Sequence, residues 1–271
     1  MPSFTDHLGR TISIDNTPKR IISLVPSQTE LLYALGLEAE VVGITKFCVH
    51  PPSWFRSKTR IGGTKNINPG IIDSLRPDLI IANKEENRQD QVEALATRYP
   101  VWISDIDTLP AALDMIRTIG RLTGKSPRAD QLAEKIDRRF TALAGASPHP
   151  VADRPRTAYF IWRKPWMVAG GDTFIHDMLQ RCGFDNIFHD QPRYPSITLD
   201  ALPAADCNLI LLSSEPYPFK QHHIDEIRTT LPHAAIRLVD GELFSWYGSR
   251  LLEAPAYFQA LYEGLDRKSD L

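Results

Sequence analysis

The chain has 271 residues, of which 42% are hydrophobic and 24% charged, and its formal net charge is −2. This composition excludes a disordered or fibrous protein, and the length suits two lobes of about 100 residues each. The small net charge provides no overall attraction to nucleic acid or to an anionic membrane. Because no basic run is interleaved with aromatic residues, we expect no nucleic-acid partner.

The start of the chain and its cysteines bear on its location. No apolar run reaches the ~18 residues of a membrane span, and the first residues lack the basic start and apolar stretch of a secretory signal. The sequence as written is therefore expected in the cytoplasm, whereas a leader replaced by Met1 would place the protein in the periplasm or on the cell surface. Three widely spaced cysteines, Cys48, Cys182 and Cys207, fit reduced buried thiols rather than a disulfide framework.

The first predicted element is a strand over residues 19–25, a short apolar run that ends at Pro26. A helix follows, which Ser27 or Thr29 is expected to cap and Gly36 to terminate. Strands and helices then alternate, with strands at 39–45, 78–82 and 101–105 and helices at 68–76 and 92–100. Such alternation predicts a parallel sheet with helices on both faces.

From residue 108 to residue 144 the strand pattern disappears, and apolar residues recur at helical spacing. This segment predicts one long helix or two nearly continuous ones. Gly124 weakens the middle of the segment, and Ser126 followed by Pro127 is typical of a new cap and first turn.

The remaining chain repeats the first pattern, with strands predicted at 157–162 and 235–241 and helices at 173–183 and 254–265. We therefore predict an α/β fold in which two Rossmann-like lobes with parallel sheets are joined by a long backbone helix. The predicted division is an N-terminal lobe at 1–106, the backbone helix at 107–145 and a C-terminal lobe at 146–271. A ligand cleft is expected between the lobes, lined by the loops that follow the strands.

These loops are rich in aromatic, basic and amide side chains. Flat rings and guanidinium planes give a large contact area at low entropic cost, and the basic groups suit an anionic small-molecule ligand. The candidate ligand-binding residues are Ser27, Gln28, Lys46, Phe47, His50, Lys65, Asn66, Lys84, Glu85, Trp162, Arg163, Trp166, Arg193, Tyr194, Glu215, Tyr217, Trp246, Tyr247 and Arg250. We expect a monomer that requires no cofactor.

Two alternatives use the same cleft. A direct receptor for Zn, Mn or Fe would combine His50 with Glu85, Glu215 or Asp240, although no pair of histidines has the spacing of a helical metal motif. A cytoplasmic enzyme or sensor would draw its acid and base from a set of carboxylates beside His50. That set is Glu85, Glu86, Glu215, Asp240 and Glu242. The sequence has neither a GxSxG elbow nor a phosphate loop, so we expect a binding protein and not an enzyme.

The order of several motifs resembles a known family. The motifs are "RIISLVPSQTELLYALGL", "VVGIT", "IIDSLRPDLIIAN", "LQRCGFDNIF" and "YPSITLDALPAADCNLILL". With the backbone helix they resemble the substrate-binding proteins of ABC importers for vitamin B12, iron-siderophores and haem, over most of residues 19–262. The resemblance implies a protein that changes little when it captures a cobalt or iron chelate or a cobalamin-like compound, and that passes this ligand to an ABC permease.

The resemblance also implies roles for single residues. Tyr194 matches an aromatic residue that lies against the ligand in the vitamin B12-binding members, and Ser27 with Gln28 matches a loop at the cleft. Asp200 matches one of two acidic residues that dock to arginines of the transporter.

The chain departs from those members at three positions. The first-lobe counterpart of the docking acid is Gly70, and the two tryptophans that flank the corrin correspond to Lys65 and Asn83. The expected cleft therefore carries more charge and amide than a corrin site of that type.

Overall fold

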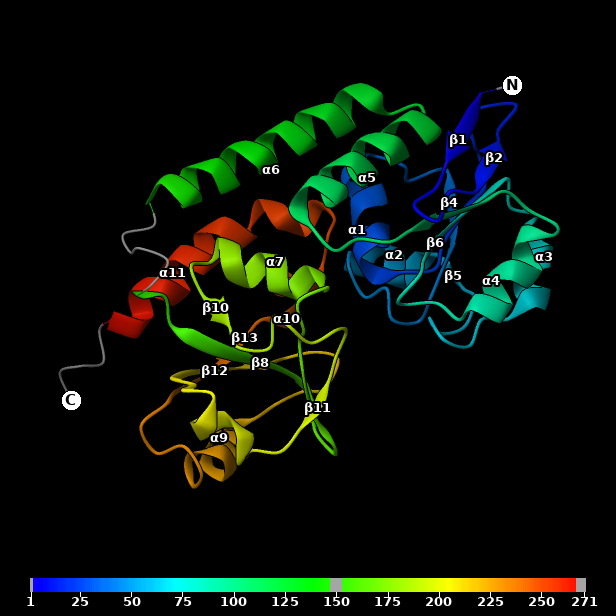
Figure 1. Ribbon diagram of the computed structural model, residues 1–271. Coiled ribbons are helices and arrows are strands. Elements are labelled where there is room, and N and C mark those ends of the chain that lie inside the picture. The colour runs from blue at the N-terminus through cyan, green and yellow to red at the C-terminus, as the bar shows by residue number, and fades with distance from the viewer. Residues whose placement is uncertain (1, 147–152, 267–271) are drawn as a thin grey trace. The chain divides into compact units, whose positions relative to one another are not determined.

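The computed structural model describes residues 2–146 and 153–266 (Figure 1). The chain forms two compact units. The first comprises Met1–Ile106, Ala111–Lys135 and Tyr247–Arg250, and the second comprises Asp107–Pro110, Ile136–Trp246 and Leu251–Leu271. The lobe boundaries predicted after residues 106 and 145 stay predictions.

The sheet of the first unit has five strands, all parallel. Their order is β5 (Thr59–Arg60), β4 (Val41–Ile44), β3 (Ile21–Ser23), β6 (Leu79–Asn83) and β7 (Val101–Ser104). The alternation of strands and helices thus gave the correct sheet, except that the two residues of β5 were not predicted as a strand. All four strands β3 to β6 end at the same edge, which places the loops that follow them together.

Helices pack on both faces of this sheet. They are α1 (Pro26–Ala34), α2 (Pro52–Ser57), α3 (Pro69–Leu75), α4 (Gln89–Ala96) and α5 (Leu109–Leu122). Ile22 and Ile80 of the strands share one buried core with Ile72 of α3 and Val92 of α4. Figure 1 shows α3 and α4 on one side of the sheet and α1 on the other. Adjacent residues of a strand face opposite ways. Because every residue of β3 and β6 is buried, these strands are covered on both faces.

The predicted side-chain cap of α1 is wrong. The helix begins at Pro26 with Val25 as its N-cap, which offers no side-chain acceptor. Ser27 and Thr29 consequently lie inside the first turns, and the Thr29 hydroxyl donates to the carbonyl oxygen of Val25 at 2.9 Å. The end of the helix agrees with the sequence, because Gly36 has a φ of +78° just beyond it.

The backbone segment is two helices, which confirms the second of the two alternatives. Helix α5 ends at Leu122, Gly124 has a φ of +69°, and α6 (Ser126–Ala146) begins at the predicted serine. The division between the units falls within α6, between Lys135 and Ile136.

The sheet of the second unit has a parallel centre and an antiparallel edge. Its order is β11 (Ser196–Ile197), β9 (Trp166–Val168), β8 (Arg156–Trp162), β12 (Leu209–Ser213) and β13 (Ala235–Val239), with β10 (Asp185–Asn186) paired to β8. Strands β8, β10, β12 and β13 are parallel, as expected. Only residues 163–165 separate β8 from β9, which is too short for a crossover, so β9 runs antiparallel.

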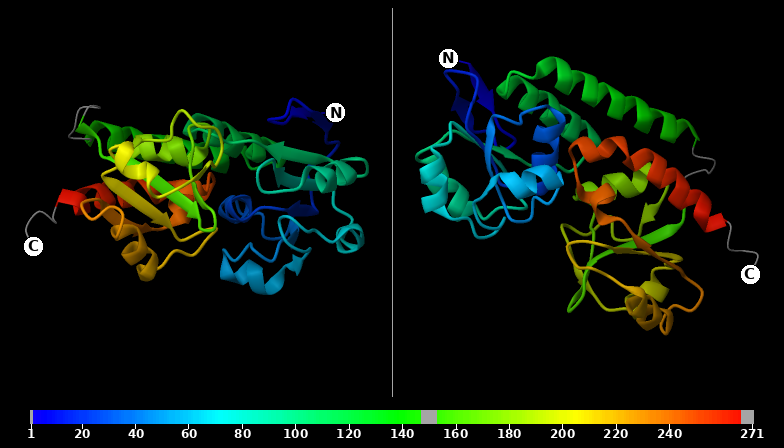
Figure 2. Two further views of the ribbon diagram at one scale, coloured as in Figure 1. Left: turned by 60° about the horizontal axis from the view of Figure 1, so that its bottom comes forward. Right: turned by 180° about the vertical axis from the view of Figure 1, so that it is seen from behind.

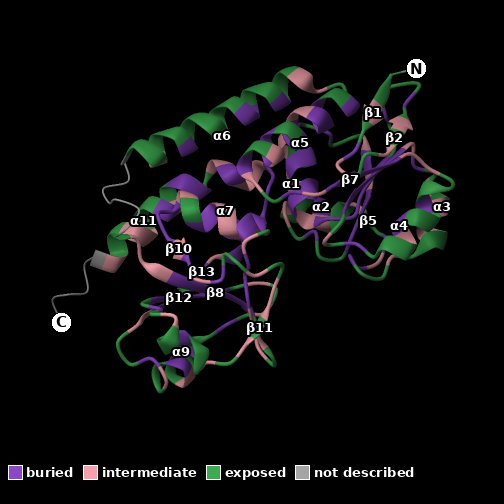
Figure 3. Ribbon diagram, viewed as in Figure 1, coloured by how far each residue is buried: buried purple, intermediate pink, exposed green. Residues whose placement is uncertain are grey.

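Helices also cover both faces of the second sheet (Figure 2). They are α7 (Phe174–Arg181), α8 (Ala201–Ala204), α9 (Gln221–Arg228), α10 (Gly241–Ser245) and α11 (Ala254–Asp266). Phe160 of β8 joins the core beneath Ile224 of α9, whereas its neighbour Tyr159 packs against Phe244 of α10, with ring centroids 5.1 Å apart. Figure 3 accordingly shows β8 and β12 as buried along most of their length.

Two further findings concern the whole described chain. None of the helices described is both long and apolar enough to cross a membrane. All three cysteines are free and buried, as expected from the sequence.

Candidate functional site

In the first unit, most predicted ligand-binding residues follow the carboxyl ends of β3 to β6. They differ in exposure: Lys46, Phe47, Lys65, Asn66 and Lys84 are exposed, His50 and Glu85 are half-buried, and Ser27 and Gln28 are buried. The structure brings several of these loops together. Lys65 Nζ donates to the carbonyl oxygen of Glu85 at 2.5 Å, and Asn87 donates to the carbonyl oxygens of Leu24 and Thr64.

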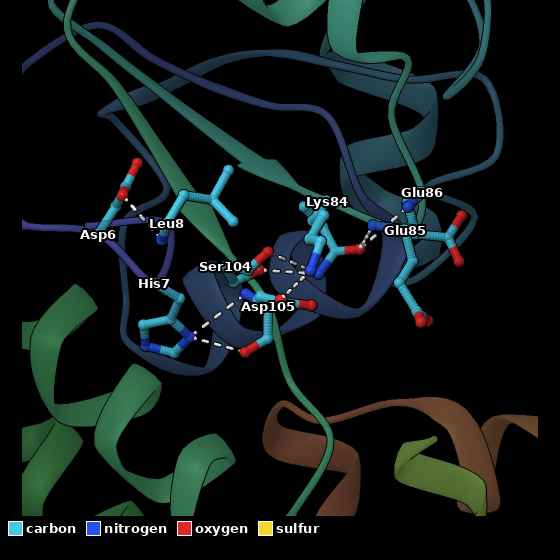
Figure 4. Close-up of polar contacts among 9 residues, drawn as sticks. Asp6, His7, Leu8, Lys84, Glu85, Glu86, Ser104 and Asp105 are labelled. Carbon is cyan, nitrogen blue, oxygen red and sulfur yellow. Dashed lines mark hydrogen bonds and ion pairs between the residues drawn. The ribbon is translucent and has the colours of Figure 1, made fainter. Parts of the chain in front are cut away.

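The buried amide of Asn83 supports the loop after β6, whose residues Lys84, Glu85 and Glu86 are labelled in Figure 4. Asn83 Oδ1 accepts the backbone N–H groups of Glu85 and Glu86 at 2.9 and 3.0 Å. Its Nδ2 donates to the carbonyl oxygen of Ser104 at 3.1 Å. Asn83 therefore fixes the residues that carry the predicted contacts, a role that the sequence did not indicate.

Gln28 lies in the same buried network. Its Nε2 donates to Ser104 Oγ at 2.5 Å, and its Oε1 is buried with no hydrogen-bond partner among the described residues. Ligand contact by Ser27 and Gln28 stays a prediction, and their burial favours a supporting role.

The basic residues of this edge have different surroundings. Lys84 Nζ forms an ion pair with Asp105 Oδ2 at 2.5 Å, which balances its charge (Figure 4). Lys46 Nζ lies 5.1 Å from the centre of the Phe47 ring, and 52% of the Phe47 residue surface is exposed. Lys46 and Phe47 thus present a cation beside a flat apolar surface.

In the second unit, four aromatic side chains pack together around the carboxyl ends of β8 and β12 and the start of β9. We define the aromatic surface as Trp162, Trp166, Tyr217 and Phe219. Trp162 meets Tyr217 edge to face at 5.6 Å, and Trp166 stacks on Phe219 at 6.1 Å with ring planes 3° apart. Trp162 is 40% exposed and Phe219 is buried, so the surface has an accessible rim and a fixed base.

Arg163 supports this surface. Its Nε and Nη2 donate to the two carboxylate oxygens of Glu226 at 3.0 and 2.7 Å, and its guanidinium lies 5.2 Å from the Trp166 ring centre. The hydrogen-bonded Glu226 carboxylate raises the pKa of the guanidinium. Glu226 already occupies the two donors with which Arg163 would bind an anion in bidentate fashion. We therefore assign Arg163 to orienting Trp166 and not to binding a ligand anion.

Glu215 and Trp246, both predicted ligand contacts, are bonded to each other. Glu215 Oε1 accepts from Trp246 Nε1 and from Ser245 Oγ, each at 2.8 Å. Trp246 is only 7% exposed. This contact joins the loop after β12 to the end of α10.

Arg193 and Tyr194 are presented by a loop that runs along the glycine pair after β9. Gly170 N donates to the carbonyl oxygen of Arg193, and Gly171 N donates to that of Gln191, both at 2.8 Å. A Cβ atom on Gly171 would stand 1.9 Å from the carbonyl oxygen of His189. The "GGD" sequence thus permits close backbone approach, and the Thr173 side chain caps α7.

Arg250 and Tyr247 belong to the first unit. Arg250 Nη2 donates to Glu30 Oε2 at 2.5 Å, and Tyr247 is 7% exposed. Ligand contact by either residue stays a prediction.

The remaining predicted sites are a metal position and a docking acid. Among the residues described, no group of three or more His, Cys, Asp or Glu side chains could hold a metal ion. Asp200 is exposed at the start of α8, and Gly70 is exposed in α3. Metal binding by His50 and docking by Asp200 stay predictions.

Comparison with known proteins shows the family of this chain. The family model described as periplasmic binding protein matches residues 21–235. This chain belongs to the periplasmic binding protein family. The match confirms the resemblance inferred from the motifs.

Three similar proteins illustrate the membership. An uncharacterized ABC transporter substrate-binding lipoprotein of Bacillus subtilis, YvrC, is 27% identical over 92% of this periplasmic binding protein and 81% of its own length. The vitamin B12-binding protein of Pectobacterium carotovorum is 27% identical over 88% of this chain and 86% of its own. The crystal structure of the periplasmic vitamin B12-binding protein BtuF of Vibrio cholerae superposes with a TM-score of 0.77, at 22% identity, over 93% of this chain and 99% of that one.

Proposed function

We propose that this protein is the substrate-binding component of an ABC importer and that it captures an anionic metal chelate or a cobalamin-like compound. The family membership and the names of the relatives support the class of function. This ligand class includes cobalt and iron complexes, and the protein binds its ligand without performing a reaction on it.

The observation that carries the proposal is the aromatic surface of the second unit. Trp162 is exposed and meets Tyr217 edge to face, while Arg163 and Phe219 both pack against the Trp166 ring. A rigid aromatic face binds a flat or macrocyclic ligand with little loss of side-chain entropy. A general acid or base pair would not require such a face.

Exposed basic residues in both units favour an anionic ligand. The first unit offers Lys46 and Lys65 at the strand ends, and the second offers the exposed Arg193. These cations suit carboxylate or phosphate groups at the edge of a chelate. The resemblance implies that Lys65, which is exposed, and Asn83, which is buried, replace the two tryptophans that flank the corrin in vitamin B12-binding members, so we favour a more polar chelate over a corrin flanked by two indoles.

The proposal includes a partner and a location. As the relatives are named substrate-binding or periplasmic proteins, we infer that this protein works outside the cytoplasmic membrane and docks to a permease through a face that includes Asp200.

Titration calorimetry tests the proposal with cyanocobalamin, haemin and a ferric siderophore as three separate ligands. We expect micromolar or tighter binding of at least one, about −8 kcal/mol or more in free energy. Trp162→Ala should weaken that binding, whereas Tyr33→Ala, which removes a similarly exposed ring on α1, should not. Equal affinities of the two variants would contradict the placement of the ligand.

A further inference from the structure

His223 joins the beginning of α9 to the loop that carries Glu215 and Tyr217. The ring Nδ1 of His223 accepts the backbone N–H of Lys220 at 2.9 Å, and the backbone N–H of His223 donates to the carbonyl oxygen of Lys220 at 2.9 Å. Its Nε2 lies 3.1 Å from the hydroxyl of Tyr217. His223 is 3% exposed, so these bonds are made in a site that excludes most water.

These contacts determine which ring nitrogen of His223 carries the proton. A backbone N–H can only donate, so Nδ1 must be an unprotonated acceptor. The neutral ring therefore carries its proton on Nε2, which donates to the Tyr217 oxygen. A second proton could bind only at Nδ1, where it would face the N–H of Lys220.

We propose that His223 is a positioning residue for the aromatic surface, and that protonation of its ring on acidification releases the Lys220 amide and the Tyr217 side chain. The ring holds Tyr217, and Tyr217 holds the exposed Trp162 edge to face. The regulatory part of this inference rests on the proposed ligand-binding function, but the release itself is a property of the ligand-free protein.

The groups around His223 favour its neutral form at pH 7. Those that face it are His222 and Glu226 on α9, Arg163 on the turn after β8, and Tyr217 and Lys220 on the loop. Burial lowers the pKa of His223 most, and His222 and Arg163 act in the same direction, whereas the backbone hydrogen bond with Lys220 and the charge of Glu226 act in the opposite direction. Glu226 is itself held by Arg163.

Because the pKa of His223 is lowered, acidification destabilises the state in which the ring is held. Below the ordinary histidine value of about 6.5, the unfolded or released ring binds a proton more readily than the held ring does. The held state is therefore fully stabilised above about pH 6.5 and loses stability as the pH falls toward the lowered pKa.

The test follows three signals of the ligand-free protein from pH 8 to pH 5: the ¹⁵N shifts of the His223 ring, the exchange protection of the Lys220 amide and the fluorescence of Trp162. We expect an Nε2-protonated ring at pH 8. On acidification the amide protection should fall about three- to tenfold, as for one lost hydrogen bond, together with a change in fluorescence.

Two substitutions separate the bonds. His223→Asn places an amide oxygen near the position of Nδ1 and cannot titrate, so the Lys220 amide should stay protected at every pH. His223→Gln reaches toward Tyr217 instead, so the Lys220 amide should be unprotected at every pH. His222→Asn is the matched control on the neighbouring exposed histidine, and it should keep the transition.

The inference is overturned if the ring carries its proton on Nδ1 at pH 8, if the Lys220 amide does not respond when His223 titrates, or if the transition persists in His223→Asn. Because all three signals are read without ligand, a protein that shows the transition but binds no chelate would refute the proposed function and leave the positioning role intact. In a protein that does bind, affinity should fall on acidification in the wild type and less in His223→Asn.

Discussion

Arg250 and Glu30 form a largely buried ion pair in the first unit, although they are 220 positions apart in the sequence. Arg250 Nη2 and Nε donate to Glu30 Oε2 at 2.5 and 3.2 Å, and the side chains are only 16% and 18% exposed. Ser249 Oγ also donates to Glu30 at 3.3 Å. The pair fastens residues 247–250 to α1.

Arg250→Ala should therefore reduce the free energy of unfolding by about 2 kcal/mol, because it leaves a poorly solvated carboxylate without its partner. Urea denaturation measures the change. Arg88→Ala, which removes the exposed pair with Asp90, is the control and should leave stability unchanged. A loss of chelate affinity in Arg250→Ala without loss of stability would instead support the ligand contact predicted from the sequence.

Asn83→Ala should destabilise the loop after β6. The substitution leaves the N–H groups of Glu85 and Glu86 without their acceptor, and we expect a cost of about 2 kcal/mol. Hydrogen exchange should show faster exchange at both amides. Asn66→Ala, at an exposed amide in a neighbouring loop, is the control. Unchanged exchange at Glu85 and Glu86 would show that Asn83 does not hold this loop.

Two glycine substitutions should have opposite effects. Gly171→Ala forces a Cβ atom against the backbone of His189 and should cost about 2 kcal/mol or more. Gly145→Ala, in α6, meets no atom within 4 Å and should stabilise the protein by about 0.5 kcal/mol. Thermal unfolding of the two variants compares them. Equal midpoints would mean that the chain beside Gly171 can move away at little cost.

The thiols should be unreactive in the folded protein. Burial is the main cause that raises the pKa of Cys48, Cys182 and Cys207, the last to about 11, so little thiolate is present at pH 8. A thiol reagent such as Ellman's should label the three cysteines slowly in buffer and rapidly in urea. Rapid labelling of a thiol in buffer would show that its burial is transient.

The sequence predicted the fold in more detail than the site. Continuous apolar runs such as residues 79–82 can be satisfied only by burial on both faces, so they indicated parallel strands correctly. The two-residue strand β5 and the antiparallel pair β9 and β11 were missed, because segments of two or three residues carry too little pattern to be recognised.

Prediction of the site was limited because side chains that bond to each other are often far apart in the sequence. Arg163 and Glu226 are 63 residues apart, and Trp246 and Glu215 are 31 apart, yet each pair is bonded. From their loop positions alone, three of these four were predicted to contact the ligand, and those contacts stay predictions. Glu226 and His223 lie in a helix that reads as an ordinary amphipathic one, so nothing in the sequence indicated their supporting roles.

The most direct test of the proposed function is the affinity of Trp162→Ala and Tyr33→Ala for whichever of cyanocobalamin, haemin and a ferric siderophore binds the wild type. If the aromatic surface holds the ligand, Trp162→Ala should weaken binding about tenfold or more and Tyr33→Ala should match the wild type. If none of the three chelates binds, or if Trp162→Ala binds as the wild type does, the proposal of chelate capture at this surface is contradicted.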